Sequence, residues 1–318
     1  MNKLYDAITE IHDEYIFDAE NATKKNHSFR WKPLVAAVLV VVLLAIPVSA
    51  EVVNGYVSNL LAPLFGGAQT EIVDKIGKPI GATVTADGYT LTADAVIGDQ
   101  YNVAIVYTLS RDDGQPIPEG THFAEWDTDI IWGASGGGSL TQVKNEEDPS
   151  KLHFIESWSR ESPLIGRYVS AYFSELEIYN ENGEDIPIAD GPWELKYTLR
   201  YEDTSVNIPV NALKVTDTNG KNYQINKISI SNVGLRLEGV IFDPQWRGEP
   251  PFGAFEVCVR TKDGTVTLLE DTNAGGGYSV GDKTAKFHFN AMFEIPFELK
   301  EIEALIICGT EHSVSISE

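Results

Sequence analysis

Side chains that carry out metal chemistry are sparse in this 318-residue chain. Four histidines follow residue 50, and none is followed by a second metal ligand two or four positions further along the chain, the spacings that place two ligands on one face of a strand or helix. They are His122, His153, His288 and His312. His288 alternates with Phe287 and Phe289, which predicts a position on the solvent face of a strand. We therefore expect structural or surface histidines and no metal site.

Two acidic stretches have the composition of calcium loops. Ca²⁺ needs roughly six to eight oxygen ligands. Asp217-Thr218-Asn219-Gly220 is better explained as a turn, and Asn145-Glu146-Glu147-Asp148 as a solvated loop. Cys258 and Cys308 lack the CxxC spacing of a zinc site. They could form a disulfide outside the cell, although alternation places Cys258 on a polar strand face, and the pairing stays open.

Short enzyme signatures give little support for catalysis. HExxH, SxxK and a phosphate-binding glycine loop are absent, and Gly133-Ala134-Ser135-Gly136-Gly137 has only the letters of GxSxG. The glycine-rich residues 133–138 lack a following Lys and a strand-loop-helix context, so they predict a hairpin tip. We expect no catalytic residue, no cofactor and no enzymatic activity.

A candidate binding surface lies at the amino terminus. Leu4, Ile8, Ile11 and Tyr15 recur at spacings of four, three and four, the apolar stripe of an amphipathic helix with acidic residues opposite. So short a helix is marginal alone in water and gains its stability by packing. The acidic side disfavours a membrane surface. We predict that these four residues contact a protein partner; a leader without function is the alternative.

The uncharged residues 34–50 follow a basic cluster made of Lys24, Lys25, Arg30 and Lys32. A helix over this stretch covers roughly 25 Å, against a hydrocarbon core of ~30 Å. Positive flanks remain cytoplasmic, so we expect the amino terminus inside and residues after the span outside the cell. Val48-Ser49-Ala50 also has the pattern of a processing site, and secretion after cleavage near Ala50 is the alternative.

Charge limits the partners of the outer region. The net charge is −23, and residues 1–32 are nearly neutral, so the outer region holds 19 basic and 41 acidic residues. Such a surface repels nucleic acid and anionic lipid headgroups. The hydrophobic content of 43% is ample for sizeable cores. We expect no nucleic-acid partner.

The outer region changes from helical to strand periodicity. Apolar pairs every four residues over 52–65 and a short segment over 71–76 predict helices. From residue 80 the pattern has period two: Tyr89, Leu91, Ala93 and Ala95 alternate with polar residues, and Asn-Gly and Asp-Gly pairs punctuate the strands. We predict a mainly β fold with two extracellular immunoglobulin-like antiparallel β-sandwich domains after a single transmembrane helix. The predicted parts are a cytoplasmic segment (1–32), the span (33–53), a juxtamembrane helical stalk (54–78) and the two sandwiches (79–204 and 205–318).

Four stretches and their order resemble a known family. They are the leader with Leu4-Tyr5-Asp6-Ala7-Ile8, the basic-aromatic Arg30-Trp31-Lys32, the block 80–109 with Asp87-Gly88-Tyr89-Thr90-Leu91-Thr92, and the restart over 208–240. The family comprises single-pass membrane proteins of Gram-positive, clostridia-like bacteria that are described as anti-sigma factors. Their outer part is a domain of unknown function followed by an immunoglobulin-like domain.

This resemblance implies a mechanism. The cytoplasmic segment would sequester an extracytoplasmic-function sigma factor while the outer domains sense an envelope ligand whose identity the sequence leaves open. The chain departs from better-defined anti-sigma domains because its cytoplasmic part is short and lacks a His/Cys zinc pattern. A cell-surface binding or adhesion module without cytoplasmic signalling is the alternative function.

Overall fold

The computed structural model describes residues 55–65, 70–130, 136–145, 148–180, 182–242, 254–269 and 285–316, which belong to one compact unit. The expected partner contacts Leu4, Ile8, Ile11 and Tyr15 and the expected span (33–53) lie outside these residues. Within the described part, no helix has the length and apolar character needed to cross a membrane.

Within the described residues, three short helices precede the strands, in the region where the sequence has helical periodicity. They are α3 (Tyr56–Leu60), α4 (Ala62–Phe65) and α5 (Thr70–Ile76). Gly77 ends the helical segment, and its N–H still bonds to the Val73 carbonyl at 2.9 Å. A Cβ at Gly77 would lie 2.8 Å from side-chain carbons of Leu61 and Val57. Only glycine lets α3 and α5 come this close to the start of β1.

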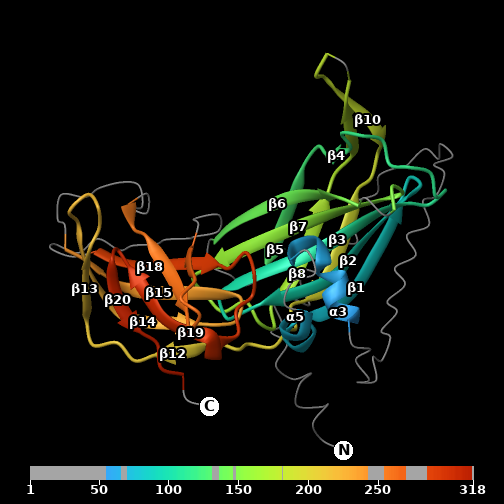
Figure 1. Cartoon of the computed structure of the whole chain (residues 1–318). Helices are drawn as coiled ribbons and strands as arrows, with labels where there is room; N and C mark the ends of the chain where they lie inside the picture. Colours follow the sequence, from blue (N-terminus) through green and yellow to red (C-terminus); the bar gives the residue numbers. More distant parts are fainter. Residues whose placement is uncertain are drawn as a thin grey trace, which may run out of the picture. The chain divides into compact units, whose positions relative to one another are not determined.

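Eleven of the strands form what we call the first β-module (Figure 1). The large sheet has the order β1-β2-β3-β7-β6, and two three-stranded sheets have the orders β10-β9-β4 and β11-β8-β5, all antiparallel. The bounds are β1 (Lys78–Ala86), β2 (Tyr89–Gly98), β3 (Asn102–Arg111), β4 (His122–Phe123), β5 (Trp126–Ile130), β6 (Gly136–Lys144), β7 (Lys151–Arg160), β8 (Tyr168–Phe173), β9 (Leu176–Tyr179), β10 (Asp185–Ala189) and β11 (Trp193–Thr198).

The remaining strands form the second β-module. One sheet has the order β12-β14-β15-β18 with β13 also paired to β14, and the other has the order β17-β16-β19-β20. The bounds are β12 (Val206–Ile208), β13 (Leu213–Thr216), β14 (Asn222–Ile230), β15 (Gly234–Ile241), β16 (Val257–Thr261), β17 (Val266–Leu268), β18 (Ala285–Met292), β19 (Ile302–Ile307) and β20 (Thr310–Ser313). A short 3-10 helix, η2 (Leu299–Glu301), precedes β19.

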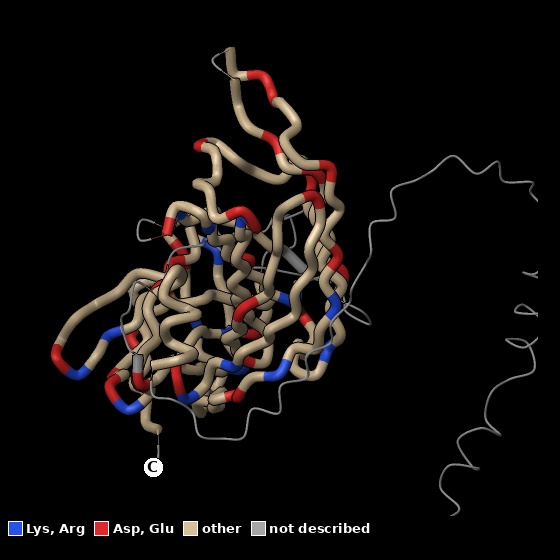
Figure 2. The backbone as a smooth tube through the Cα atoms, turned by 90° about the vertical axis from the view of Figure 1, so that its right-hand side faces the viewer, with Lys and Arg blue, Asp and Glu red and all other residues tan. Residues whose placement is uncertain are grey.

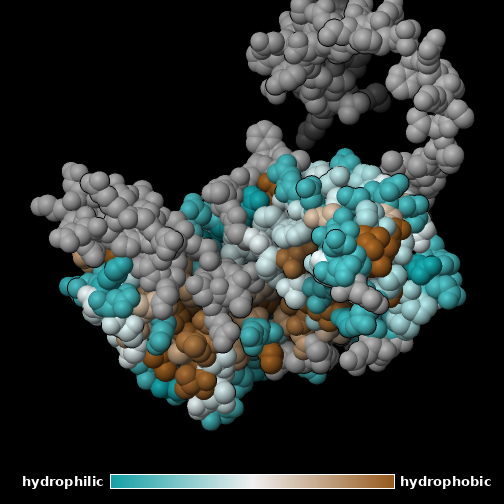
Figure 3. All heavy atoms as spheres, turned by 90° about the horizontal axis from the view of Figure 1, so that it is seen from above, coloured by the Kyte–Doolittle hydropathy of each residue, from teal (hydrophilic) through white to brown (hydrophobic). Residues whose placement is uncertain are grey.

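The prediction of a mainly β, antiparallel chain is confirmed, and the arrangement is compatible with β-sandwiches. Each module has its own apolar core between its sheets. The first core centres on the fully buried Trp193, Tyr107 and Phe173, and the second on Tyr223 and Phe289. Seen from above, hydrophilic side chains surround several hydrophobic patches of the described surface (Figure 3).

A β-bulge corrects the predicted alternation of β2. Leu91 and Ala93 lie in the first core as expected, but the pairing with β3 shifts register between Ala93 and Ala95. The extra residue, Asp94, turns the strand over, because one inserted residue exchanges the two faces. Ala95 therefore lies on the opposite face of the large sheet, against the helices.

The structure also contradicts the solvent-exposed position predicted for His288. Its exposed fraction is only 9%, and its Nε2 lies 3.7 Å from Glu161 of the first module. Alternation correctly separates His288 from the second core, but its own face is covered by other parts of the chain.

The two cysteines do not form a disulfide. Cys258 and Cys308 are both free, and each is partly buried. Burial raises the pKa of both thiols, to about 11 for Cys308. The pairing that the sequence left open is therefore absent from the fold.

A carboxyl group lies in the first core. Glu156 of β7 is fully buried, and one carboxylate oxygen accepts a hydrogen bond from the Tyr107 hydroxyl at 2.7 Å. The other oxygen has no hydrogen-bond partner among the described residues. Burial penalises the ionised form and raises the pKa of Glu156 to about 7.

Glu156 makes stability depend on pH. A raised pKa in the folded state means that the native chain holds this proton more tightly than the unfolded chain. Its contribution is therefore complete below the ordinary value of 4.5 and is lost as pH rises through about 7. We expect the unfolding free energy of wild type, minus that of Glu156→Gln, to fall by roughly 3 kcal/mol between pH 4 and pH 8. Denaturant titrations of both proteins measure this difference, and a pH-independent difference would contradict the assignment.

Candidate functional site

The helices and both β-modules meet in a third apolar cluster, which we call the junction. The helices contribute one side of it, and the end of the large sheet contributes the other. Its helical members are Val57, Leu61, Phe65, Ile72, Val73 and Ile76; its sheet members are Ala95, Ile97, Ala104, Val106 and Ile155. Val233 and Met292 of the second module complete it. In Figure 1, α3 and α5 lie beside the strands of the large sheet.

A carboxylate fastens the helices to each other. Asp74 of α5 accepts hydrogen bonds from the backbone N–H groups of Gly55 and Ser58, both at 2.7 Å. These groups lie at the amino end of α3, where the first N–H groups have no partner within the helix and the helix dipole favours negative charge. The contact between the two short helices thus stabilises them, whereas their own length would not.

Asp99 forms the polar part of the junction. It follows β2 and is 4% exposed. Its carboxylate accepts hydrogen bonds from the N–H groups of Tyr101 and Asn102 at 2.8 Å, from the Asn102 amide, and from the Ser231 hydroxyl of the second module at 2.8 Å. Ser231 in turn accepts bonds from the N–H groups of Val233 and Gly234. A directional network therefore links the modules beside the apolar cluster.

Burial and hydrogen bonding shift the pKa of Asp99 in opposite directions. Removal from water raises the pKa of the carboxyl group, while the bonds from Tyr101, Asn102 and Ser231 lower it; burial is the larger effect. The space is also closed, because a Cβ at Gly234 would lie 2.8 Å from Asp99, Asn102 and the Ala291 carbonyl. Position 234 therefore has no room for a side chain larger than that of glycine.

An arginine reaches across the same boundary. Arg236 of β15 lies with its guanidinium carbon 4.0 Å from the centre of the Tyr101 ring, a cation–π contact. It also donates to Glu238 at 2.6 Å and to Asn290 at 3.0 Å, and Asn290 donates to the Arg160 carbonyl of β7. A buried guanidinium needs such partners, and here they fix the contact geometry.

The junction combines apolar packing with one buried carboxylate and one buried guanidinium. Sequence reasoning identified the helices but not this shared cluster. The signal was the almost continuous apolar character of Ala95-Val96-Ile97 and Val103-Ala104-Ile105-Val106, which is typical of strands buried on both faces.

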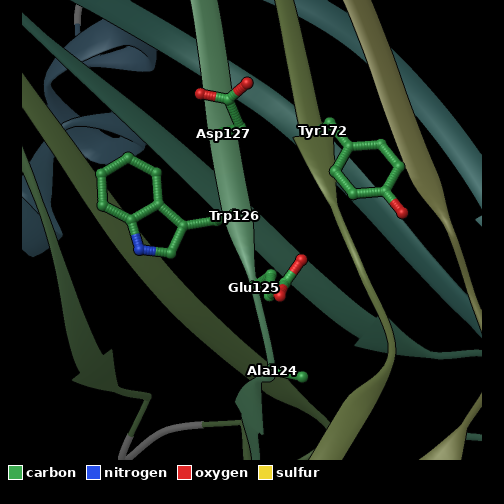
Figure 4. A pocket seen from close by; sticks show the side chains of 5 residues that line it. All are labelled: Ala124, Glu125, Trp126, Asp127 and Tyr172. Atoms are coloured by element: carbon green, nitrogen blue, oxygen red, sulfur yellow. The ribbon is translucent and has the colours of Figure 1, made fainter.

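The first module has an open surface beside Trp126. Trp126 packs partly buried against the first core, and Trp132 lies outside the described residues. An open depression nearby is lined by Ala124, Glu125, Trp126, Asp127 and Tyr172 (Figure 4). Asp127 pairs in register with Tyr172 of β8, so the two share a sheet face, and Tyr172 is 41% exposed.

Among the described residues, His122, Glu177 and Asp185 are the one group of side chains that could hold a metal ion. The sequence did not indicate it, because the ligands come from β4, β9 and β10. The turn signal Asn182-Gly183 predicts the β9–β10 hairpin, but no local pattern predicts that β4 pairs with β9.

Comparisons with known proteins give information on the fold and none on the function. No family model matches this chain, and no curated protein matches it either. The chain is similar in fold to the crystal structure of a conserved domain protein from Bacillus anthracis. The TM-score is 0.50 and the sequence identity 16%, over 73% of this chain and 76% of that one. At this identity the likeness concerns the fold alone.

The link between the modules can be measured with a double-mutant cycle on Asp99→Asn and Ser231→Ala. Residues that share a hydrogen bond have coupling energies of roughly 0.5–3 kcal/mol. We expect a value in this range from denaturant unfolding of the four proteins. Asp217→Asn is the matched control, because Asp217 is also buried and bonded to backbone N–H groups but lies in a turn of the second module. Its changes should add to those of Ser231→Ala, and equal coupling for the two aspartates would refute a specific link.

Proposed function

We propose that this chain is a membrane-anchored, non-enzymatic regulator of the anti-sigma-factor type. In this proposal residues 33–53 cross the membrane once, and two immunoglobulin-like β-sandwiches outside the cell sense an envelope ligand. The amphipathic residues Leu4, Ile8, Ile11 and Tyr15 bind an extracytoplasmic-function sigma factor in the cytoplasm. The buried packing of α3–α5 in the junction is the observation that carries the proposal.

In the sequence, the helices lie between the proposed span and the β-modules, so a signal from the modules to the span would have to pass through them. The proposed span ends two residues before Gly55, and two residues extend over at most ~7 Å. Six helical side chains are buried against the large sheet and the second module. Burial of such side chains contributes roughly 1.5–3 kcal/mol each, on the order of 10 kcal/mol together. Tyr56 at the start of α3 is 52% exposed, as suits an aromatic side chain near a membrane interface.

This arrangement supports transmission and not simple tethering. If the linker were flexible, a conformational change in the outer modules would not alter the position of the span. Helices that share one core with both modules must move when the modules change their contact. A ligand can act through this path only by binding the two arrangements with different affinity. The acidic outer region, visible as the many red segments in Figure 2, favours a cationic or neutral ligand over an anionic one.

Partner capture tests the cytoplasmic side. We expect the double substitution Ile8→Asp and Ile11→Asp to reduce recovery of the sigma factor at least tenfold, because a buried, unpaired charge in the apolar stripe opposes docking. The full chain would be cross-linked in cells, purified from membranes, and its partners identified by mass spectrometry. Asp6→Asn with Glu10→Gln, on the polar side of the same helix, is the matched control and should recover as much as wild type. Equal recovery by the apolar-stripe variant would sink the proposal.

A surface-binding or adhesion module is the second candidate function. The feature that favours it is the open depression with the exposed Tyr172, since aromatic side chains bind sugar rings and peptides by stacking. This candidate needs no cytoplasmic contact, so deleting residues 2–20 would leave it intact.

Protease treatment of intact cells separates these candidates at the level of topology. For the regulator we expect an added protease to digest the β-modules while an epitope tag at Met1 stays protected and membrane-bound. Permeabilised cells are the control, and there the tag should be lost. A mature protein that begins at Glu51 and accumulates in the medium favours the secreted alternative, and protected β-modules in intact cells contradict both.

A further inference from the structure

His122, Glu177 and Asp185 converge on one face of the three-stranded sheet β10-β9-β4. His122 pairs directly with Glu177 in register, and Asp185 pairs with Tyr179, two residues beyond Glu177 on the same face of β9. The Nε2 atom of His122 lies 3.3 Å from an Asp185 oxygen and 3.7 Å from a Glu177 oxygen. All three ligand atoms lie within 4.8 Å of one another. Three strands thus bring one imidazole and two carboxylates together.

The imidazole ring is held in a defined orientation. Its Nδ1 atom lies 2.9 Å from the carbonyl oxygen of Gly120, and its ring stacks on Tyr179 with centroids 4.4 Å apart and planes inclined by 15°. A carbonyl oxygen only accepts hydrogen bonds, so Nδ1 must carry the proton. In the neutral ring the Nε2 lone pair then points at the two carboxylates. This arrangement, in which Nδ1 bonds to a backbone carbonyl and Nε2 is left free, is the usual one for metal-ligating histidines.

The distances suit a cation between the three groups better than direct hydrogen bonds. Charge-assisted N–H···O⁻ bonds measure ~2.7–2.9 Å. A tetrahedral first-row ion with bonds of ~2.0–2.2 Å instead separates its ligand atoms by ~3.4 Å. The 3.3 and 3.7 Å separations lie near the second value. The Asp185 side chain is 50% exposed and can rotate to close the remaining gap.

The charge balance also calls for a cation. Glu177 is only 15% exposed and Asp185 lies close to it, yet neither pairs with Lys or Arg within the described part of the chain. Two neighbouring carboxylates repel each other and an acceptor nitrogen as well. We propose that His122, Glu177 and Asp185 bind a first-row divalent cation such as Zn²⁺ or Mn²⁺, with the remaining coordination position taken by water.

Such an ion ties the β9–β10 hairpin to β4. The hairpin pairs with the rest of the first module through β4 alone in its sheet, and β4 has only two residues. In Figure 1, β4 and β10 lie at the upper end of the first module, and in Figure 2 the uppermost loops carry acidic segments. The ion therefore stiffens the part of the module with the fewest strand contacts, and an acidic surface raises the local concentration of cations.

Isothermal titration of the full chain in detergent micelles, stripped of metal and free of a histidine tag, tests the site. We expect one ion to bind per chain, and His122→Ala, Glu177→Gln and Asp185→Asn each to weaken binding at least tenfold. Glu184→Gln and His312→Ala are matched controls, a neighbouring carboxylate on the hairpin and a distant surface histidine, and should stay within twofold of wild type. Mn²⁺ is titrated in parallel with Zn²⁺, because the free thiols of Cys258 and Cys308 compete for zinc but bind manganese weakly.

A second measurement distinguishes variants that have lost a ligand from variants that bind poorly because they fold poorly. Binding to the native state raises the melting temperature, by an amount that grows with the logarithm of the ion concentration above the dissociation constant. We expect saturating Mn²⁺ to raise it by a few degrees in wild type and Glu184→Gln, and not in Asp185→Asn. The proposal is overturned if wild type binds neither ion at a stoichiometry of one, or if none of the three ligand variants loses affinity. In either case the three side chains contact one another without holding an ion.

Discussion

One end of the large sheet is buried on both faces, and this double burial determines what surrounds it. Val96, Val103 and Ile105 point into the first core, while Ala95, Ile97 and Val106 point the other way into the junction. Antiparallel sheets commonly leave one face to water. Here the second face is apolar, so helices and the second module must cover it. The alanines at positions 95 and 104 are small enough to let the helices approach the strands closely.

Apolar packing alone would not fix how these parts meet, because it has little directional preference. Asp99 and Arg236 supply the direction. Each is buried, and each would be costly to leave unpaired, so the contact between the modules is favourable only in the register that satisfies both. The Asp99 carboxylate draws its partners from its own loop and from Ser231 of the second module. The two kinds of interaction therefore contribute differently, since apolar burial stabilises the contact and hydrogen bonding makes its geometry specific.

The sequence predicted those features that depend on residues close together along the chain. Period-two alternation and Asp-Gly or Asn-Gly pairs locate most strands and turns, and Asp217 indeed forms a turn by accepting bonds from the N–H groups of Asn219 and Lys221. Ala95 was assigned to the wrong face because a bulge depends on the partner strand and leaves no local signal. His288 was assigned to solvent because alternation distinguishes two faces but does not say what covers the outer one. The His122 group was missed for a related reason, since it requires pairing between segments far apart in the chain.

The junction and the proposed cation site differ in how tightly the surrounding structure holds them. The junction is closed, fully packed and shared by three parts of the chain. The β9–β10 hairpin is held by a two-residue strand and carries exposed side chains such as Tyr179 and Ile186. Only Ser174 and Glu175 separate β8 from β9, and Leu176 at the start of β9 is buried in the first core. A change in the hairpin therefore reaches the core through covalent continuity and packing. The large sheet separates that core from the junction, and side chains of β2 and β3 contact both. The β9–β10 hairpin and the helices are thus connected through a single sheet with two buried faces.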